Sequence, residues 1–228
     1  MSIKLIVFDI AGTTVRDNHE VSQTFHHALK KHGYLIEIES IDPLMGYEKN
    51  LAILTLLQTY EPDGGKITPE LVKQIHTEFV QLMINHYKFS PDIEPLPYVE
   101  ETFVALHQQG VQIAINTGFS KDIAEVVVER LQWREKGLID HLIGSDEVLQ
   151  GRPHPFMIEK LMVDSGITDP LAIAKVGDTE VDVREGQNAN CRYVIGITTG
   201  IFTRQELEKY HPTHIIDDIR EVLAIINQ

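Results

Sequence analysis

The sequence predicts an α/β protein: a doubly wound, Rossmann-like parallel sheet into which an all-helical cap domain is inserted. The chain starts with a short apolar run that ends at Asp9, and a purely helical pattern follows. From Tyr98 onward, short apolar runs alternate with amphipathic stretches, which is typical of a parallel sheet covered by helices on both faces. With 228 residues and 43% hydrophobic content, the chain is long enough for one such core plus a smaller insertion.

The elements follow from local patterns. The apolar run before Asp9 predicts a buried strand, and amphipathic spacing or a capping sequence predicts helices at 20–31, about 48–57 and 68–87. Three prolines within 90–97 end this helical part and make a semi-rigid linker. Later strands are expected at 111–115, 141–144, 172–176, 193–197 and 214–216, and helices at 121–131, 155–165, 181–189 and 204–210. Because the first strand must join this sheet, we expect a core of residues 1–16 and 90–228 and a cap of residues 17–89.

The amino-acid composition argues against several classes of function. The chain has 20 basic and 34 acidic residues, a formal charge of −14, which argues against a nucleic-acid surface or attraction to anionic lipid. No apolar stretch approaches the ~20 residues that span a bilayer, and no signal segment is visible at the N-terminus. The single cysteine, Cys191, excludes an internal disulfide and fits a reducing compartment, so we expect a cytoplasmic protein. Motifs for nucleotide, dinucleotide and zinc binding are missing.

Three aspartates are candidates for chemistry. Asp9 ends the first strand, at the sheet edge where open α/β sheets bind ligands, and is a candidate nucleophile or metal ligand. Asp178 and Asp182 follow another strand, and with Asp9 they could hold a hard cation such as Mg²⁺. The alternative is structural, because Asp is also common in turns and at helix N-termini.

Four motifs in order give the chain a resemblance to the haloacid dehalogenase-like hydrolase superfamily. They are Asp9-Ile10-Ala11-Gly12-Thr13, a strand ending in Asn116-Thr117-Gly118, Gly151-Arg152-Pro153, and Gly177-Asp178-Thr179 with Asp182. The resemblance implies a hydrolase in which Asp9 attacks phosphorus to form an aspartyl-phosphate. It also implies Mg²⁺ held by Asp9, the Ala11 carbonyl and Asp178, with Asp182 ligating directly or through water.

The same resemblance suggests roles for the second and third motifs. Thr117 and the Gly118 amide would bind the phosphoryl group, and Arg152 would pair with phosphoryl oxygen and with the Asp9 carboxylate. Read without the resemblance, Thr117 is an ordinary strand-end residue and Arg152 a solvated loop cation.

Position 11 narrows the family further. Phosphatases of this superfamily carry a second Asp there, which acts as the general acid, whereas this chain has Ala11. The phosphonoacetaldehyde hydrolase (phosphonatase) branch also has Ala at this position, and its Asp-x-Ala-Gly-Thr-Thr run is similar to residues 9–14. Met45-Gly46-Tyr47-Glu48-Lys49 is similar to that branch's cap segment, which implies that Lys49 forms a Schiff base with a substrate aldehyde while Met45 packs beside it. The simpler interpretation of Lys49 is a cation that clamps phosphate or faces water.

One residue departs from that branch. Its members have a catalytic His three residues after the lysine, where this chain has Ala52. His26 or His27 could reach the site from another helix, although two adjacent residues cannot lie on the same face of a helix. The leading hypothesis is Mg²⁺-dependent cleavage of the C–P bond of phosphonoacetaldehyde or a related small phosphonate. The alternatives are a phosphatase or phosphomutase-type enzyme on a small phosphate ester, and a non-catalytic phospho-ligand binder. The sequence leaves a monomer or a homodimer open.

Overall fold

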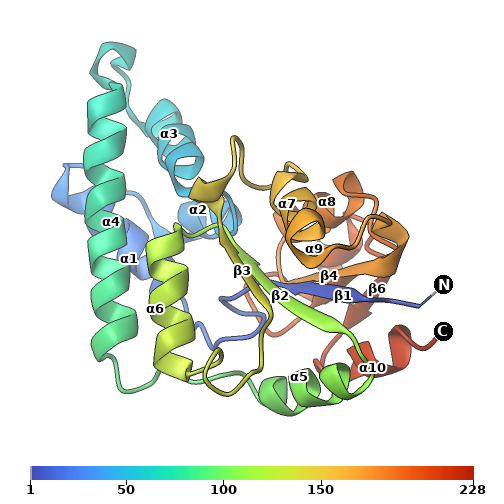
Figure 1. Ribbon diagram of the computed structural model, residues 1–228. Coiled ribbons are helices and arrows are strands. Elements are labelled where there is room, and N and C mark those ends of the chain that lie inside the picture. Colours follow the sequence, from blue (N-terminus) through green and yellow to red (C-terminus); the bar gives the residue numbers. More distant parts are fainter. Residues whose placement is uncertain (1) are drawn as a thin grey trace.

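A six-stranded parallel sheet forms the centre of the protein (Figure 1). The computed structural model describes residues 2–228. The strands are β1 (Leu5–Phe8), β2 (Gln112–Thr117), β3 (His141–Gly144), β4 (Ile173–Gly177), β5 (Tyr193–Ile197) and β6 (His214–Ile216), in the spatial order β3-β2-β1-β4-β5-β6. Phe8 at the end of β1 is in register with Ile115 of β2 and Val176 of β4. The first strand of the chain therefore lies in the middle of the sheet, and the order reverses beside it.

Both faces of the sheet are covered, which explains why β1 is apolar along its whole length. Ile6 and Phe8 of β1 face one hydrophobic core, while Leu5 and Val7 face a second core on the opposite side. The covering helices of the sheet region are α5 (Val99–Gln108), α6 (Lys121–Leu131), α7 (Phe156–Ser165), α8 (Glu180–Asn188), α9 (Arg204–Glu208) and α10 (Glu221–Ile225). In Figure 1, α5 and α10 lie below the sheet and α7, α8 and α9 lie above it.

A helical segment, residues 20–89, lies beyond one end of the sheet. Its helices are α1 (Glu20–Lys31), α2 (Ile38–Ile41), α3 (Lys49–Tyr60) and α4 (Pro69–Phe89). Phe79 of α4 contacts Phe25 of α1 edge-on at 5.1 Å and lies 6.3 Å from the Phe119 ring of the sheet region, measured between ring centroids. The segment thus has an apolar interior of its own that continues into the larger core on that side of the sheet.

Two short chain crossings join the helical segment to the sheet region, and they pair with each other. The Arg16 amide donates to the Glu94 carbonyl at 3.2 Å, and the Leu96 amide donates to the Thr14 carbonyl at 3.0 Å. Arg16 and Glu94 also form an exposed ion pair at 2.9 Å. The prolines of the second crossing suit this position, since an extended crossing needs few backbone donors.

The predicted fold class is confirmed, and the differences are local. Five expected elements (20–31, 121–131, 141–144, 193–197 and 214–216) have the expected bounds, whereas the helices α2, α5 and α10 were not predicted. Strand β2 begins one residue later than expected and runs on to Thr117, because the polar Asn116 is fully buried among charged partners. The proposed division into a core and a cap at 16/17 and 89/90 stays a prediction.

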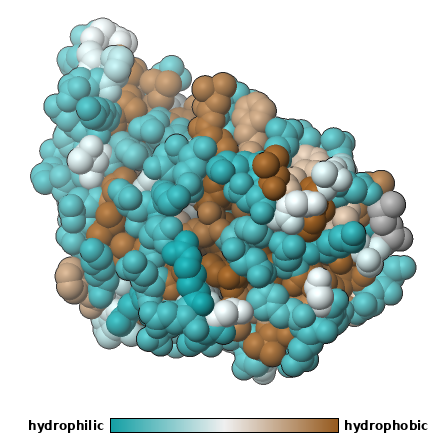
Figure 2. All heavy atoms as spheres, in the orientation of Figure 1, coloured by the Kyte–Doolittle hydropathy of each residue, from teal (hydrophilic) through white to brown (hydrophobic). Residues whose placement is uncertain are grey.

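The surface agrees with the acidic composition. Figure 2 shows a face that is mainly hydrophilic, with hydrophobic residues in separate patches. Within residues 2–228, every helix is too short or too polar to pass through a lipid bilayer.

Candidate active site

The polar centre of the protein lies at the carboxyl ends of the adjacent strands β1 and β4. Asp9 directly follows β1, Asp178 directly follows β4, and Asp182 lies in the first turn of α8. One carboxylate oxygen from each of the three lies within 4.8 Å of the others, and all three side chains are buried. The predicted grouping of these aspartates is therefore present, at the point where the strand order reverses.

Close backbone packing fixes Asp178. Its Oδ1 accepts a hydrogen bond from the Thr13 hydroxyl at 3.2 Å, and its Oδ2 accepts one from the Ile201 amide at 2.9 Å. A Cβ at Gly200 would overlap the Asp178 carboxylate, and Gly12, with φ of 77°, could carry a side chain only under strain. These glycines let two loops approach the carboxylate directly.

Arg152 lies beneath Asp9 and is completely buried. Its Nη1 donates to Asp9 Oδ1 at 2.7 Å, and its Nη2 donates to the Asn116 carbonyl and Oδ1 at 2.7 and 2.6 Å. Its Nε donates to Glu185 Oε2 at 3.1 Å, and Nη1 lies 2.9 Å from Asp182 Oδ1. The predicted pairing of Arg152 with the Asp9 carboxylate is present, and the guanidinium is fixed on several sides.

Lys175, in the middle of β4, completes this buried network. Its Nζ lies 2.7 Å from Asn116 Oδ1, 2.9 Å from Asp182 Oδ1 and 3.5 Å from Glu185 Oε2. Both oxygens of Asp182 are therefore engaged, since Thr179 Oγ1 donates to Oδ2 at 2.5 Å. Asp182 thus has protein partners at both oxygens, which favours a metal contact through water over direct ligation.

The electrostatics of the aspartates favour a cation. Burial raises the pKa of Asp178 well above its usual range, and the nearby Asp9 and Asp182 carboxylates raise it further. Burial also raises the pKa of Asp9, against the opposing effect of Arg152. For Asp182, Arg152 and Lys175 outweigh burial and lower the pKa. Asp9 and Asp178 are thus the two aspartates whose ionised forms the protein stabilises least, and hard oxygen donors of this kind fit Mg²⁺.

Thr117 and Gly118 form the neighbouring wall at the end of β2. Thr117 is buried, and its Oγ1 accepts a hydrogen bond from the Phe119 amide at 3.2 Å. A Cβ at Gly118 would lie 2.7 Å from the Tyr47 carbonyl oxygen, so glycine is needed where the loop before α3 packs onto the sheet region. Gly46 of that loop has φ of 89°, and a Cβ at this position would lie 2.7 Å from Thr179 Oγ1.

Lys49, the first residue of α3, points from the helical segment into this centre. Its side chain is buried, its Nζ donates to the Tyr47 carbonyl at 3.1 Å, and it lies 5.5 Å from the centre of the Phe119 ring. Burial lowers the pKa of Lys49 to about 8, although the Asp9 carboxylate acts in the opposite direction. Met45 is buried beside it.

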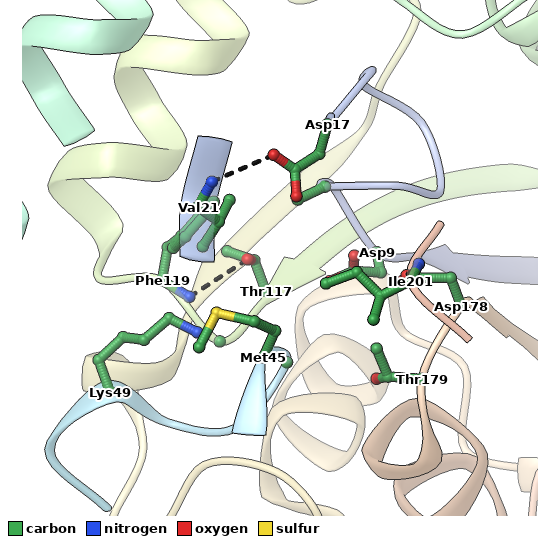
Figure 3. Close-up of a pocket in the computed structure, with 13 residues that line it drawn as sticks. Asp9, Asp17, Val21, Met45, Lys49, Thr117, Phe119, Asp178, Thr179 and Ile201 are labelled. Carbon is green, nitrogen blue, oxygen red and sulfur yellow. Dashed lines mark hydrogen bonds between the residues drawn. The ribbon is translucent and has the colours of Figure 1, made fainter. Parts of the chain in front are cut away.

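A small cavity of about 30 Å³ joins these residues (Figure 3). Its lining includes seven predicted site residues: Asp9, Ala11, Met45, Lys49, Thr117, Gly118 and Asp178. Arg152 and Asp182 lie behind this surface and contact Asp9 or its partners instead. The cavity has room for about two water molecules, so the helical segment covers the site closely in this conformation.

Sequence reasoning missed several residues here. Lys175 and Glu185 form the buried ion network, and Asp17 lines the cavity. The sequence signal for Lys175 is a lone cation inside an apolar strand, which needs a buried partner. The suggestion that His26 or His27 reaches the site is wrong: His26 Nδ1 lies 2.6 Å from the Ile36 carbonyl oxygen, and His27 is exposed. Neither lines the cavity, because α1 turns both away from it.

Comparisons with known proteins agree with this geometry. A phosphonoacetaldehyde hydrolase from Bacillus cereus (strain B4264) is 27% identical over 241 residues, covering 99% of this chain and 87% of that protein. A solved phosphonoacetaldehyde hydrolase-like protein from Oleispira antarctica superposes with a TM-score of 0.82 at 18% identity, covering 100% of this chain and 92% of the other. A predicted phosphoglycolate phosphatase from Haemophilus somnus gives 0.81 at 23% identity, with 99% and 98% coverage.

The profile of one protein family matches most of the chain. Residues 6–196, which contain all four motifs, match the haloacid dehalogenase-like hydrolases. The protein therefore belongs to the haloacid dehalogenase-like hydrolase family of enzymes.

Proposed function

We propose that this enzyme is a Mg²⁺-dependent, phosphonatase-like hydrolase that cleaves the C–P bond of phosphonoacetaldehyde or a related small phosphonate. One observation carries the proposal: the buried Lys49 amine lines the same small cavity as Asp9. With a pKa of about 8, a substantial fraction of this amine is neutral near pH 7.5, as an attack on an aldehyde requires. Ala11 supports the proposal, because a leaving carbon activated through an imine needs no carboxylic acid at that position.

Each residue of the site has a separate role in this proposed reaction. Lys49 attacks the aldehyde carbon, and loss of water leaves a protonated imine that can accept electrons. Asp9 then attacks phosphorus, the C–P electron pair passes into the imine to give an enamine, and water later hydrolyses the aspartyl-phosphate. Thr117 and the Gly118 amide hold the phosphoryl oxygens, and Arg152 holds the Asp9 carboxylate in place.

The metal would be bound by Asp9, Asp178 and the Ala11 carbonyl, with Asp182 acting through water. It would supply positive charge to the phosphoryl oxygens during transfer.

We further propose that residues 17–89 act as the cap that brings Lys49 to the substrate. Gly46 and Gly118 support this, since their lack of side chains permits the close contact between the two parts.

A second function is favoured by a specific observation. Ala52 is buried in α3 and offers no proton-transferring group one turn after Lys49. An ester phosphatase or phosphomutase would use Lys49 only as a phosphate clamp, for which its charge suffices. The solved phosphatase described above has the same fold, so the architecture is compatible with either reaction.

Borohydride trapping separates the two functions. Purified enzyme is incubated with Mg²⁺, phosphonoacetaldehyde and borohydride, and peptide mass spectrometry locates any reduced adduct. C–P cleavage predicts inactivation with the adduct on Lys49, and an inactive Lys49→Arg variant, because a guanidinium cannot form the imine. Lys66→Arg, on the surface of the helical segment, is the matched control and should keep both activity and adduct.

The opposite outcome identifies the ester function. No adduct, together with an active Lys49→Arg variant, would exclude the imine and favour a phosphatase. Ala11→Asp should then raise hydrolysis of small phosphate esters by up to ~10²-fold, because it restores a general acid.

A further inference from the structure

The proposed reaction needs proton transfers for which no group has yet been named. Among the described residues that line the cavity, the titratable side chains are Asp9, Asp17, Lys49 and Asp178. Asp9 acts as nucleophile, Lys49 forms the imine, and Asp178 belongs to the metal site. Asp17 is the cavity carboxyl without an assigned role.

Asp17 is held at the upper edge of the cavity by the helix that follows it. Its Oδ1 accepts a hydrogen bond from the Val21 amide at 3.1 Å, which fixes one side of the carboxyl at the start of α1. In Figure 3, Asp17 and Lys49 lie on opposite sides of Thr117, with Asp9 below Asp17. A small substrate whose phosphoryl group lies at Asp9 and whose carbon chain turns toward Lys49 would lie between them once the cavity has widened to admit it.

The surroundings of Asp17 favour its protonated form. Burial and the adjacent Glu20 carboxylate raise the pKa of Asp17 to about 7. Lys49 of α3 and Tyr87 of α4 also interact with it electrostatically, and the neutral Tyr87 phenol adds no charge near pH 7. A carboxylic acid that titrates near neutral pH can both give and take a proton during one turnover.

We propose that Asp17 is the general acid–base residue of this active site, a role that rests on the imine chemistry of the proposed function. After Lys49 adds to the aldehyde and a proton moves from nitrogen to oxygen, the product is a neutral carbinolamine. Asp17 donates its proton to the hydroxyl as the C–O bond breaks, water leaves, and the nitrogen lone pair forms the iminium.

Asp17 regains its proton in the later steps of the reaction. After C–P cleavage, a proton from solvent converts the enamine carbon to a methyl group and regenerates the iminium. The Asp17 carboxylate then takes a proton from the water that attacks this iminium, which restores the acid form. Collapse of the carbinolamine releases the aldehyde and the Lys49 amine, so no oxidant or further reactant is needed.

The competing explanation is that Asp17 only caps α1. Asp17→Asn separates the two roles, because an amide oxygen can still accept from the Val21 amide while the proton is lost. Asp17→Glu keeps an acid but moves it. Asp63→Asn is the matched control: Asp63 also caps a helix start, through the Gly65 amide at 3.0 Å, but lies outside the cavity.

The experiment measures turnover of phosphonoacetaldehyde against pH for these variants, the thermal midpoint of each, and borohydride trapping at Lys49. We expect Asp17→Asn to lower kcat about 10²-fold and to slow trapping, with the thermal midpoint unchanged. Its pH profile should change from a bell centred between 7 and 8 to a rise that reaches a plateau. Asp17→Glu should recover part of kcat, and Asp63→Asn should match the wild type.

Two results overturn the inference in distinguishable ways. If the wild type turns over and is trapped while Asp17→Asn keeps full kcat and the bell-shaped profile, Asp17 has no part in proton transfer and the proposed function stands. If the wild type neither turns over the aldehyde nor forms the adduct, the proposed function fails, and the role of Asp17 in imine chemistry fails with it.

Discussion

Arg152→Lys keeps the positive charge beneath Asp9 but removes the planar guanidinium that distributes it. The guanidinium has partners on Asp9, Asn116, Glu185 and Asp182 at 2.6–3.1 Å, and the side chain is completely buried. An ammonium group has three donors on a single atom and cannot reach partners on several sides of the plane. At least two buried acceptors should therefore lose their donor.

The expected cost follows from those lost donors. A hydrogen bond to a charged group contributes about 1.5–3 kcal/mol, so the loss of two lowers the free energy of unfolding by about 3–6 kcal/mol. For a domain of this size, each kcal/mol shifts the thermal midpoint by about 2–4 °C, which predicts a fall of at least ~6 °C. The single tryptophan, Trp133, is fully buried and is a convenient fluorescent probe of urea unfolding.

Arg16→Lys is the control, because Arg16 forms an exposed pair with Glu94 and should change stability by less than about 0.5 kcal/mol. The reasoning would be refuted if Arg152→Lys unfolded within about 1 kcal/mol of the wild type with full activity. That result would mean that the multiple contacts of the guanidinium are not needed to satisfy the buried carboxylates.

Three further expectations concern the chemistry. Asp9→Asn should abolish turnover while far-ultraviolet circular dichroism stays unchanged, since it removes the proposed nucleophile and keeps the shape of the side chain; more than a few per cent of residual activity would argue against an aspartyl-phosphate. Chelation with EDTA should silence the enzyme and excess Mg²⁺ should restore it, whereas full activity in EDTA would exclude the metal site. The third concerns Lys49, whose pKa is about 8 in the folded protein against 10.5 in a free chain. Between these values the unfolded chain binds more protons, so wild-type stability should rise with pH relative to Lys49→Met, and parallel urea midpoints across pH 7–10.5 would contradict this.

The sequence predicted the fold well, because the strands and helices carry strong local signals. The apolar runs at β1 and β5 and the amphipathic pattern of α1 show their type directly. The short helix α2 was missed, because four residues give too little periodicity to recognise.

The site was predictable only where a motif marks it. Asp9, Asp178 and Lys49 could be proposed because they lie in short recognisable runs; the structure places all three in the lining of one cavity, and their roles stay predictions. Lys175 contacts Asp182 on α8 and Asp17 lines a cavity formed by segments far apart in the chain, and a linear sequence does not show such proximity. Such residues become visible only when burial and charge are considered together.

The small volume of the cavity has a kinetic consequence. A space for about two waters is smaller than any organophosphorus substrate, so a molecule cannot simply diffuse onto Asp9 from solution. Capture must wait for the site to open, and a required conformational change lowers an association rate constant. A site that must widen before it binds can discriminate between molecules twice, once on entry and again on closing.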